Sequence, residues 1–318
     1  MKFFEIKSND ENQRLDKFLQ KAVPLLPHSL MYKYIRLKRI KVNGKKSDIS
    51  YKLRLNDKLE LYINDEFFID NIDEKFLNVS KDFGIIYEDK NILLVDKPSG
   101  LVVHEDNENS LDTLINRVLH YLYDNGEYSP ENEASFIPAL CNRIDRNTAG
   151  IVIVAKNSES LRVLNEKIRN REIRKFYLCV VAGHPKATEK VLKHFQIKRP
   201  SDNTVTVFDA PQKEAKTMLT KYKILKESTD NSLLEIELLT GRTHQIRAVM
   251  AHLGFPLIGD GKYGTNKINS KYKQKSQLLY SYKLIFNFND DENILSYLNK
   301  KEFKAKNIWF YDKFTENF

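Results

Sequence analysis

The sequence predicts an α+β protein with two domains of unequal size: a small domain over residues 1–64, a linker over 65–81 and a large domain over 82–318. Three observations predict this arrangement. The chain has 318 residues, more than one hydrophobic core usually organises. Short runs with strand periodicity alternate with helical segments along the chain. An acidic stretch without clear periodicity separates the two structured parts.

The N-terminal part is expected to contain two short helices. The first begins as an amphipathic helix at Arg14 and is ended by Pro24 and Pro27. Ser29 is the expected N-cap of the second helix, which runs to Leu37.

A hairpin is expected next, from an alternating strand over 39–45 with an Asn-Gly turn and a second strand over 57–63. Cations concentrate on the second helix and the adjoining turn. A charge run is usually only a solvated face, but the net charge of +9 and the pI near 9.2 favour a polyanionic partner. The candidate contacts to it are Lys33, Arg36, Lys38, Arg39 and Lys45, with Lys41 and Lys46 beside them.

The large domain is expected to open with a hairpin over 84–87 and 91–95, followed by a turn at 96–100 that contains Pro and Gly. Helical spacing and strand alternation then follow each other to the middle of the domain. We predict helices over 111–122 with Ser110 as N-cap and over 158–171, and a further helix that the stretch 240–247 enters and that Gly254 ends. Strands are predicted over 174–183, 213–225 and 233–239.

One loop combines charge with a buried strand. Asp145 lies between Arg143 and Arg146, and the apolar run 151–155 that follows reads as a strand buried on both faces. A carboxylate at the edge of a buried element needs a charged partner, because burial of an isolated acid costs several kcal/mol. The two neighbouring arginines are the local candidates, and a salt bridge that only orients the loop is the simplest interpretation.

A second polar stretch enters a helix. Arg242, His244 and Arg247 precede or begin a helix with an apolar stripe, so they are expected beside free backbone N–H groups, as at a phosphate site. His244 and His252 have no third ligand nearby in the sequence and lack the i, i+4 spacing of a zinc helix, so we predict no metal.

Strand alternation places Tyr177 on the face opposite Phe176 and Leu178. Ordinary aromatic packing is the common role at such a position. A tyrosine preceded by two cations also suits stacking on a nucleic-acid base.

The composition excludes several classes of protein. No apolar stretch is long enough to span a membrane, and the N-terminus lacks the apolar core of a signal peptide, so we expect a cytoplasmic protein. Cys141 and Cys179 lie in or beside apolar runs, and two cysteines define neither a disulfide framework nor a zinc site. Buried free thiols are expected.

Two stretches of motifs carry a resemblance to known families. Residues 14–63 resemble a small RNA-binding domain of the αL type, first known from a ribosomal small-subunit protein, through an opening Arg-Leu-Asp and an Ile-Lys-Val-Asn-Gly turn. Nearly the whole chain resembles the pseudouridine synthases that modify large ribosomal RNA and, in some members, transfer RNA. Their nucleophile signature, His-Arg-Leu-Asp, two variable residues and Thr-Ser-Gly, corresponds here to 142–150, with Asn142, Ile144 and Ala149 as departures. Two further motifs lie at 175–177 and at 241–247 with 259–264.

The resemblance implies a mixed, mostly antiparallel central sheet with flanking helices behind the N-terminal RNA-binding domain. It implies that Asp145 is the catalytic carboxylate, that Arg247 is its ion-pair partner, and that Tyr177 packs on the target base with Arg143 filling the space the base vacates. Arg146, Arg242 and His244 are expected to contact RNA. The reaction it implies rejoins ribose to another atom of the same base, so no cofactor and no metal are expected, and RNA, large-subunit ribosomal RNA first, is the expected partner of a monomer.

Three alternatives remain open. A ribosome-assembly factor could have kept the fold and lost the chemistry, and Asn142 and Ala149 favour it. A synthase of the same family could act on transfer RNA. A metal-dependent RNA hydrolase would need a carboxylate cluster that the sequence does not show.

Overall fold

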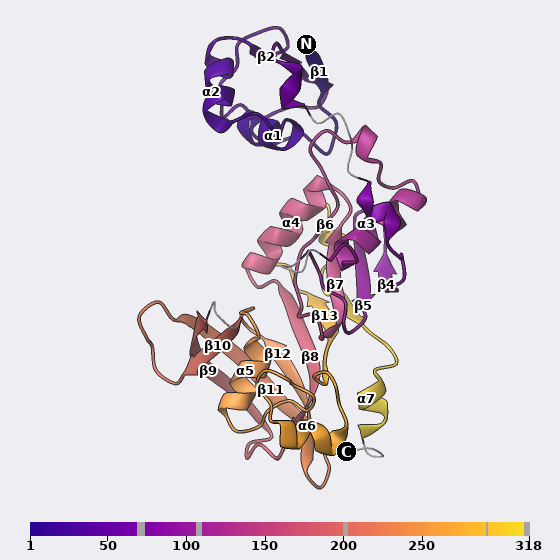
Figure 1. Cartoon of the computed structure of the whole chain (residues 1–318), viewed down its shortest axis with the longest axis vertical. Coiled ribbons are helices and arrows are strands. Elements are labelled where there is room, and N and C mark those ends of the chain that lie inside the picture. The colour runs from indigo at the N-terminus through magenta and orange to yellow at the C-terminus, as the bar shows by residue number, and fades with distance from the viewer. Residues whose placement is uncertain (69–73, 106–109, 200–202, 291, 315–318) are drawn as a thin grey trace.

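The computed structural model describes residues 1–68, 74–105, 110–199, 203–290 and 292–314. A small N-terminal unit lies at one end of an elongated molecule, and one large sheet forms the rest (Figure 1). Within the described residues, no helix is long and apolar enough to cross a membrane. The helices are α1 Leu15–Ala22, α2 His28–Arg36, α3 Leu114–Asp124, α4 Ser158–Arg169, α5 Gln245–His252, α6 Asn266–Tyr272 and α7 Trp309–Asp312. The strands are β1 Lys2–Glu5, β2 Ile40–Val42, β3 Lys58–Leu61, β4 Gly84–Glu88, β5 Ile92–Lys97, β6 Ala139–Leu140, β7 Ala149–Ala155, β8 Ile173–Ala182, β9 Glu189–Arg199, β10 Thr204–Phe208, β11 Lys216–Glu227, β12 Asn231–Leu238, β13 Leu279–Phe286 and β14 Glu302–Lys304.

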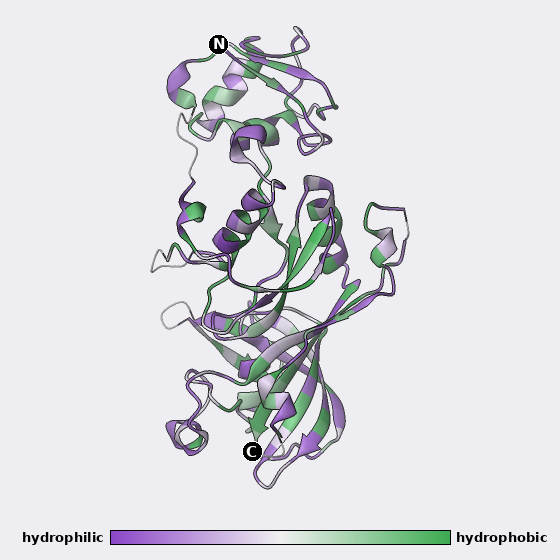
Figure 2. Ribbon diagram, turned by 90° about the vertical axis from the view of Figure 1, so that its right-hand side faces the viewer, coloured by the Kyte–Doolittle hydropathy of each residue, from purple (hydrophilic) through white to green (hydrophobic). Residues whose placement is uncertain are grey.

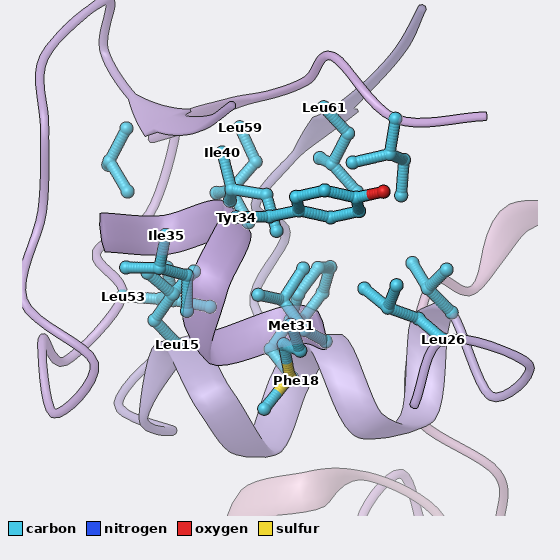
Figure 3. Close-up of a cluster of buried hydrophobic side chains, with 14 of the residues drawn as sticks. Leu15, Phe18, Leu26, Met31, Tyr34, Ile35, Ile40, Leu53, Leu59 and Leu61 are labelled. Carbon is cyan, nitrogen blue, oxygen red and sulfur yellow. The ribbon is translucent and has the colours of Figure 1, made fainter. Parts of the chain in front are cut away.

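The N-terminal unit packs α1 and α2 against a three-stranded antiparallel sheet with the order β1-β3-β2. Phe18 and Met31 of the two helices meet Leu59 and Leu61 of β3 in a core of its own (Figure 3). The two predicted helices are present. Strand β1 is an addition that the sequence did not predict, because its four residues are alternately exposed and half-buried and carry no turn signal.

Two local predictions in this unit were wrong. Ser29 is the second residue of α2 rather than its N-cap, and Pro27 occupies the N-cap position. The Asn-Gly turn is present, with Asn43 and Gly44 both at positive φ, but it joins Val42 to Lys45. Strand β3 therefore follows a long loop instead of the tight turn.

The predicted linker is partly described. Its residues 69–73 lie outside the described part of the chain. On the N-terminal side Phe68 packs in the N-terminal core, and on the other side Phe76 packs against the core beneath α3.

The large sheet is mixed and mostly antiparallel, as expected. Its strands follow the order β10-β9-β11-β12-β8-β13-β7-β5-β4, with β14 paired to β13 and β6 to β7. The pairing of β13 with β7 is parallel, whereas the other pairs of this sheet are antiparallel. The central strand β7 is buried along nearly its whole length, which explains its continuous apolar run.

Helices cover the sheet in two halves. Around β5 and β7, α3 packs on one face and α4 on the other. Around β8 and β12, α5 packs on one face, and the C-terminal segment that contains α7 packs on the other. Hydrophobic residues accordingly concentrate in the central strands (Figure 2). Ile144 contacts both the α3 core and the α5 core, so the loop that carries it lies where the two halves meet.

The remaining corrections concern element ends and missed strands. Helix α3 starts at Leu114, and Thr113, not Ser110, accepts the N-cap hydrogen bond from the Asn116 amide at 3.3 Å. Strands β9, β10 and β13 were not predicted. Much of β9 is polar and exposed, so its sequence lacks a clear strand pattern.

Candidate active site

The loop of Asp145 leads directly into β7, as predicted. Asp145 accepts a backbone hydrogen bond from Thr148 at 3.0 Å, and Gln277 donates to the Thr148 hydroxyl at 3.2 Å. Gly150 has φ +111°, and a Cβ there would lie 2.2 Å from the Ser281 carbonyl oxygen. Only glycine allows this close parallel approach of β13, so the turn and the strand pairing together fix the carboxylate at the sheet edge.

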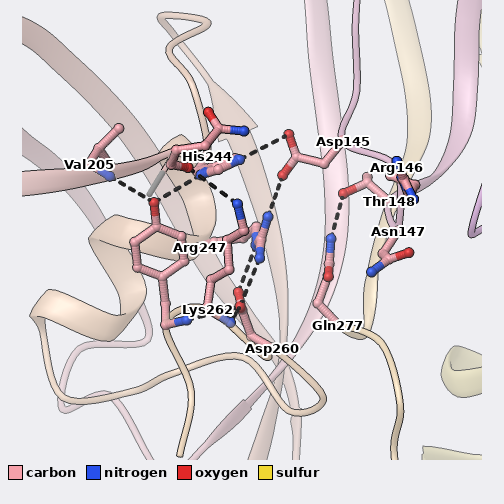
Figure 4. Close-up of polar contacts among 12 residues, drawn as sticks. Asp145, Arg146, Asn147, Thr148, Val205, His244, Arg247, Asp260, Lys262 and Gln277 are labelled. Atoms are coloured by element: carbon pink, nitrogen blue, oxygen red, sulfur yellow. Dashed lines mark hydrogen bonds and ion pairs between the residues drawn. The ribbon is translucent and has the colours of Figure 1, made fainter. Parts of the chain in front are cut away.

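Arg247 of α5 links two carboxylates (Figure 4). Its Nη1 donates to Asp145 Oδ2 at 2.8 Å, which is the predicted ion pair. Its Nε and Nη2 donate to the two oxygens of Asp260 at 2.7 and 2.8 Å. Asp260 is fully buried and also accepts the backbone N–H groups of Lys262 and Tyr263. Asp260 therefore fixes the guanidinium in a bidentate pair and leaves Nη1 for Asp145.

The pKa shifts agree with this arrangement. Burial acts to raise the pKa of Asp260, but the hydrogen bonds and charge of Arg247 outweigh it and hold the pKa below its ordinary value. Burial acts to lower the pKa of Arg247, and the two carboxylates hold it above its ordinary value. The cluster thus keeps a full positive charge against Asp145, whose side chain is 28% exposed.

His244 faces the same carboxylate. Its Nε2 lies 4.0 Å from Asp145 Oδ1, and its Nδ1 lies 2.9 Å from the Tyr263 hydroxyl. That hydroxyl accepts the Val205 N–H at 3.0 Å, so its own proton is free to donate to His244 Nδ1. The tautomer this assigns carries its proton on Nε2, towards Asp145. Burial lowers the pKa of His244, with the charge of Asp145 opposing the shift.

Tyr177 lies on β8 on the predicted face, opposite Leu178. It is 5% exposed and packs in the core beside Ile144 and Ile246. Burial raises its pKa to about 12, so the phenol stays neutral at physiological pH.

One cavity of about 1610 Å³ brings the predicted residues of the large domain together. It is larger than the roughly 300–1,000 Å³ of a typical small-molecule site. Its lining includes Asp145, Arg247, Tyr177, Arg143, Arg146, Arg242 and His244. The predicted basic residues of the N-terminal unit, Lys33, Arg36, Lys38, Arg39 and Lys45, are exposed on α2 and the loops beside β2 and do not line it.

Sequence reasoning missed the groups that support this loop. Lys97 is fully buried, and its ammonium donates to the carbonyl oxygens of Pro98, Leu101 and Arg146 at 2.7–2.9 Å. Gly100 N–H also donates to Arg146, at 2.9 Å. A lysine followed by Pro-Ser-Gly after a buried strand was the available signal, but it was interpreted only as a turn. Asp260 lies in the motif at 259–264, but nothing in the sequence indicates that it pairs with Arg247.

Asn142 supports the strand rather than the carboxylate. Its Oδ1 accepts the Ile153 N–H at 2.8 Å, and its Nδ2 lies 3.5 Å from the Ile151 carbonyl oxygen. A second departure, Ala149, begins β7 opposite Tyr280. These two of the three departures from the expected signature are thus accommodated by the backbone of β7 and its partner strand.

Comparisons with known proteins identify the family of the chain. Residues 91–252 match the RNA pseudouridylate synthase family, and residues 13–59 match the S4 domain. An uncharacterized RNA pseudouridine synthase of Mycoplasma genitalium is 35% identical, over 96% of this chain and 97% of that protein. A ribosomal large subunit pseudouridine synthase C of Buchnera aphidicola is 33% identical, over 86% and 84%. Human RNA pseudouridylate synthase domain containing 4 shares the fold, with a TM-score of 0.54 and 20% identity over 70% of this chain and 88% of that one. The chain belongs to the RNA pseudouridylate synthase family, with an S4 domain at its N-terminus.

Proposed function

We propose that this protein converts specific uridines of large-subunit ribosomal RNA to pseudouridine, with Asp145 as the reacting group and without a cofactor. The observation that carries the proposal is the chain Asp145–Arg247–Asp260 in a cavity that Tyr177 also lines. A half-exposed carboxylate with a buried, fixed counter-charge suits a group that must remain ionised and still reach its substrate.

The reaction balances within the nucleotide. The bond between ribose C1′ and N1 breaks, C1′ bonds to C5, the C5 hydrogen leaves as a proton and N1 gains one. No outside electron or heavy atom is required, so a carboxylate and a proton relay suffice. Asp145 acts either by attacking C1′ or by removing a proton from the sugar to give a transient intermediate. His244, with its N–H directed towards Asp145, is placed to orient that carboxylate.

The target base must leave its stack to enter the cavity, at a cost of a few kcal/mol. Stacking on the Tyr177 ring and occupation of the vacated space by Arg143 would offset that cost. Both residues line the cavity, and Arg143 is exposed as that role requires.

Two observations favour ribosomal RNA as the substrate. The N-terminal S4 domain presents the exposed cations of α2 and the adjoining loops to a polyanion. The Buchnera relative carries the name of a ribosomal large subunit synthase. Pseudouridine mapping of ribosomal and transfer RNA from a strain without the gene tests the choice. If a pseudouridine is lost only from transfer RNA, the substrate is transfer RNA and not ribosomal RNA, and the proposed reaction still holds.

Release of tritium from RNA labelled at uridine C5 tests the reaction. We expect Asp145→Asn to abolish release, while RNA affinity stays within about tenfold, or roughly 1.4 kcal/mol. The matched control is Asp112→Asn, which alters an exposed carboxylate paired with Arg117 and should leave release unchanged. Wild-type release by Asp145→Asn would refute the role of the carboxylate. If the wild-type protein binds ribosomal RNA but releases no tritium from any of it, the result favours an inactive assembly factor.

A further inference from the structure

A second polar cluster lies outside the candidate active site. His194 of β9, Asp209 after β10 and His252 at the end of α5 come together from three elements. One ligand atom from each lies within 4.8 Å of the others. Asp209 Oδ1 is 2.9 Å from His252 Nε2 and 3.4 Å from His194 Nε2.

His194 is not satisfied by the protein around it. The residue is 6% exposed, and its Nδ1 is buried without a hydrogen-bond partner in the described part of the chain. Its other nitrogen has Asp209 at 3.4 Å, beyond the usual 2.7–3.2 Å of an N–H···O hydrogen bond. The nitrogen that faces Asp209 thus has no hydrogen bond of ordinary length among the described residues, and it is the one that points into the cluster, whereas the buried Nδ1 lies on the other side of the ring.

The spacing of the donor atoms fits one metal ion. Two ligand atoms about 2.1 Å from the same ion lie roughly 2.9–3.4 Å apart for angles between 90° and tetrahedral. The two nitrogen-to-oxygen distances in the cluster, 2.9 and 3.4 Å, lie at the ends of that interval. Two imidazoles and one carboxylate form a donor set that zinc and the neighbouring divalent transition metals prefer over magnesium or calcium.

The cluster is open to solvent on one side. The side chains of Asp209 and His252 are 79% and 30% exposed, which gives an ion a path from solvent.

We propose that His194, Asp209 and His252 bind one divalent transition-metal ion of the zinc class, with water in the remaining positions. The ion would join the β9–β10 hairpin to the C-terminal end of α5. Both elements also serve the active site, since α5 carries Arg247 and β10 supplies the Val205 N–H to Tyr263. The site is therefore structural, and it holds the hairpin against the helix.

Metal titration of the full-length, tag-free protein after dialysis against a chelator tests the site. Co²⁺ reports its environment through visible d–d absorption, and Zn²⁺ competition gives the affinity. We expect one saturable site in the wild type, and apparent affinity reduced at least tenfold by His252→Gln and by Asp209→Asn. Both substitutions change exposed side chains and should leave the fold intact, and Zn²⁺ should raise the melting midpoint of the wild type only.

The matched control is His120→Gln. His120 Nε2 lies 3.7 Å from Asp124 Oδ2, so it is another histidine beside a carboxylate, and no third ligand joins it among the described residues. This variant should bind Co²⁺ as the wild type does. Equal affinities of wild type, His252→Gln and Asp209→Asn would overturn the proposal, as would a lack of saturable binding up to millimolar metal. Neither result depends on RNA turnover, so the proposed function would stand.

Discussion

At the scale of single residues, Arg247 pairs with the carboxylate of Asp145 and is itself held in place by that of Asp260. Its Asp145 partner is partly exposed, whereas Asp260 is fully buried and bonds two of its nitrogens. Removing one member of a buried pair leaves the other charge uncompensated. The position of the Asp145 carboxylate thus depends on Asp260, a residue that does not contact it.

The first prediction concerns Asp260→Asn. Breaking the buried pair should lower the free energy of unfolding by about 3–5 kcal/mol and reduce turnover, because Arg247 loses its bidentate support. The lowered pKa of Asp260 stabilises the fold above the ordinary value of 3.8, and this contribution is lost as pH falls through the lower folded-state pKa. Denaturant unfolding from pH 2 to 7 should show this acid loss in the wild type and a smaller one in Asp260→Asn.

The exposed Asp112–Arg117 pair supplies the control for this experiment. Asp112→Asn should cost no more than about 1 kcal/mol, as exposed pairs usually do. Equal losses in the free energy of unfolding for Asp112→Asn and Asp260→Asn would mean that the buried pair contributes no more to stability than the Asp112–Arg117 pair does.

The second prediction separates stacking from the hydroxyl of Tyr177. Since burial raises its pKa to about 12, the phenol is neutral and its ring is the part suited to a base. Tyr177→Phe should keep near-wild-type RNA capture, whereas Tyr177→Leu should raise KM or slow single-turnover release of tritium. Indistinguishable kinetics of the two variants would assign Tyr177 to core packing alone.

At the scale of elements, the turn after β5 holds the Asp145 loop. Lys97 and Gly100 both donate to the Arg146 carbonyl oxygen, and Ser99 donates to that of Asn147 at 3.0 Å. These bonds fix the residues on the C-terminal side of Asp145. The turn is therefore a positioning element for the carboxylate.

The third prediction is that Lys97→Met lowers kcat with little change in KM, because the carbonyl oxygens that accept from Lys97 lose a buried donor, at about 1–3 kcal/mol each.

Burial lowers the pKa of Lys97 to about 7, with the charge of Asp145 opposing the shift. Between pH 7 and 10.5 the unfolded chain holds the proton that the folded chain releases, so this lysine makes stability rise with pH. The free energy of unfolding should be higher at pH 9 than at pH 7 in the wild type, and the difference should be smaller in Lys97→Met. An unchanged kcat in Lys97→Met would show that the Asp145 loop does not need the hydrogen bonds of Lys97.

Local sequence signals predicted the elements whose own pattern determines them. The apolar run of β7 and the stripe of α5 that includes Val249 and Met250 form as predicted, and Gly254 follows the end of α5 at positive φ. Strand β1 forms because it pairs with the distant strand β3, which no local pattern reveals. The polar strand β9 forms because it pairs with β10 and β11, which follow it in the chain. The same limit applies to the site, since Asp260 gains its role only when the loop after α5 folds back onto Arg247.

At the scale of the molecule, the candidate active site lies where the two halves of the sheet meet. Asp145 comes from the half covered by α3 and α4, and Arg247 from the half covered by α5. The parallel pairing of β7 with β13 joins the two halves of the sheet at this point. Any relative movement of the halves would change the distance between Asp145 and Arg247, so a continuous sheet is a suitable support for this pair.

The N-terminal unit contacts the large domain through a polar interface. Lys7 donates to the Asn132 carbonyl oxygen at 2.7 Å, and Asn9 donates to Glu133 at 2.8 Å. Ser135 donates to the fully buried Asp10 at 2.6 Å. One oxygen of Asp10 and one of Glu133 are buried without a hydrogen-bond partner within the described chain. Two incompletely satisfied carboxyl groups weaken the docking of the unit when they are ionised.

The last prediction follows from these two acids. Burial raises the pKa of Asp10, with Ser135, Lys7 and Lys21 opposing it; burial and then the charge of Asp10 raise that of Glu133, with Asn9 and Lys7 opposing. A raised pKa gives docking a contribution that is complete below the ordinary values of 3.8 and 4.5 and is lost as pH rises through the shifted ones. Small-angle scattering should therefore show a more compact molecule at pH 3.8, where the contribution of Asp10 and Glu133 is present, than at pH 8. Asp10→Asn and Glu133→Gln, which imitate the protonated acids, should remain compact at pH 8, and a wild-type-like expansion of both variants would show that the interface opens for another reason.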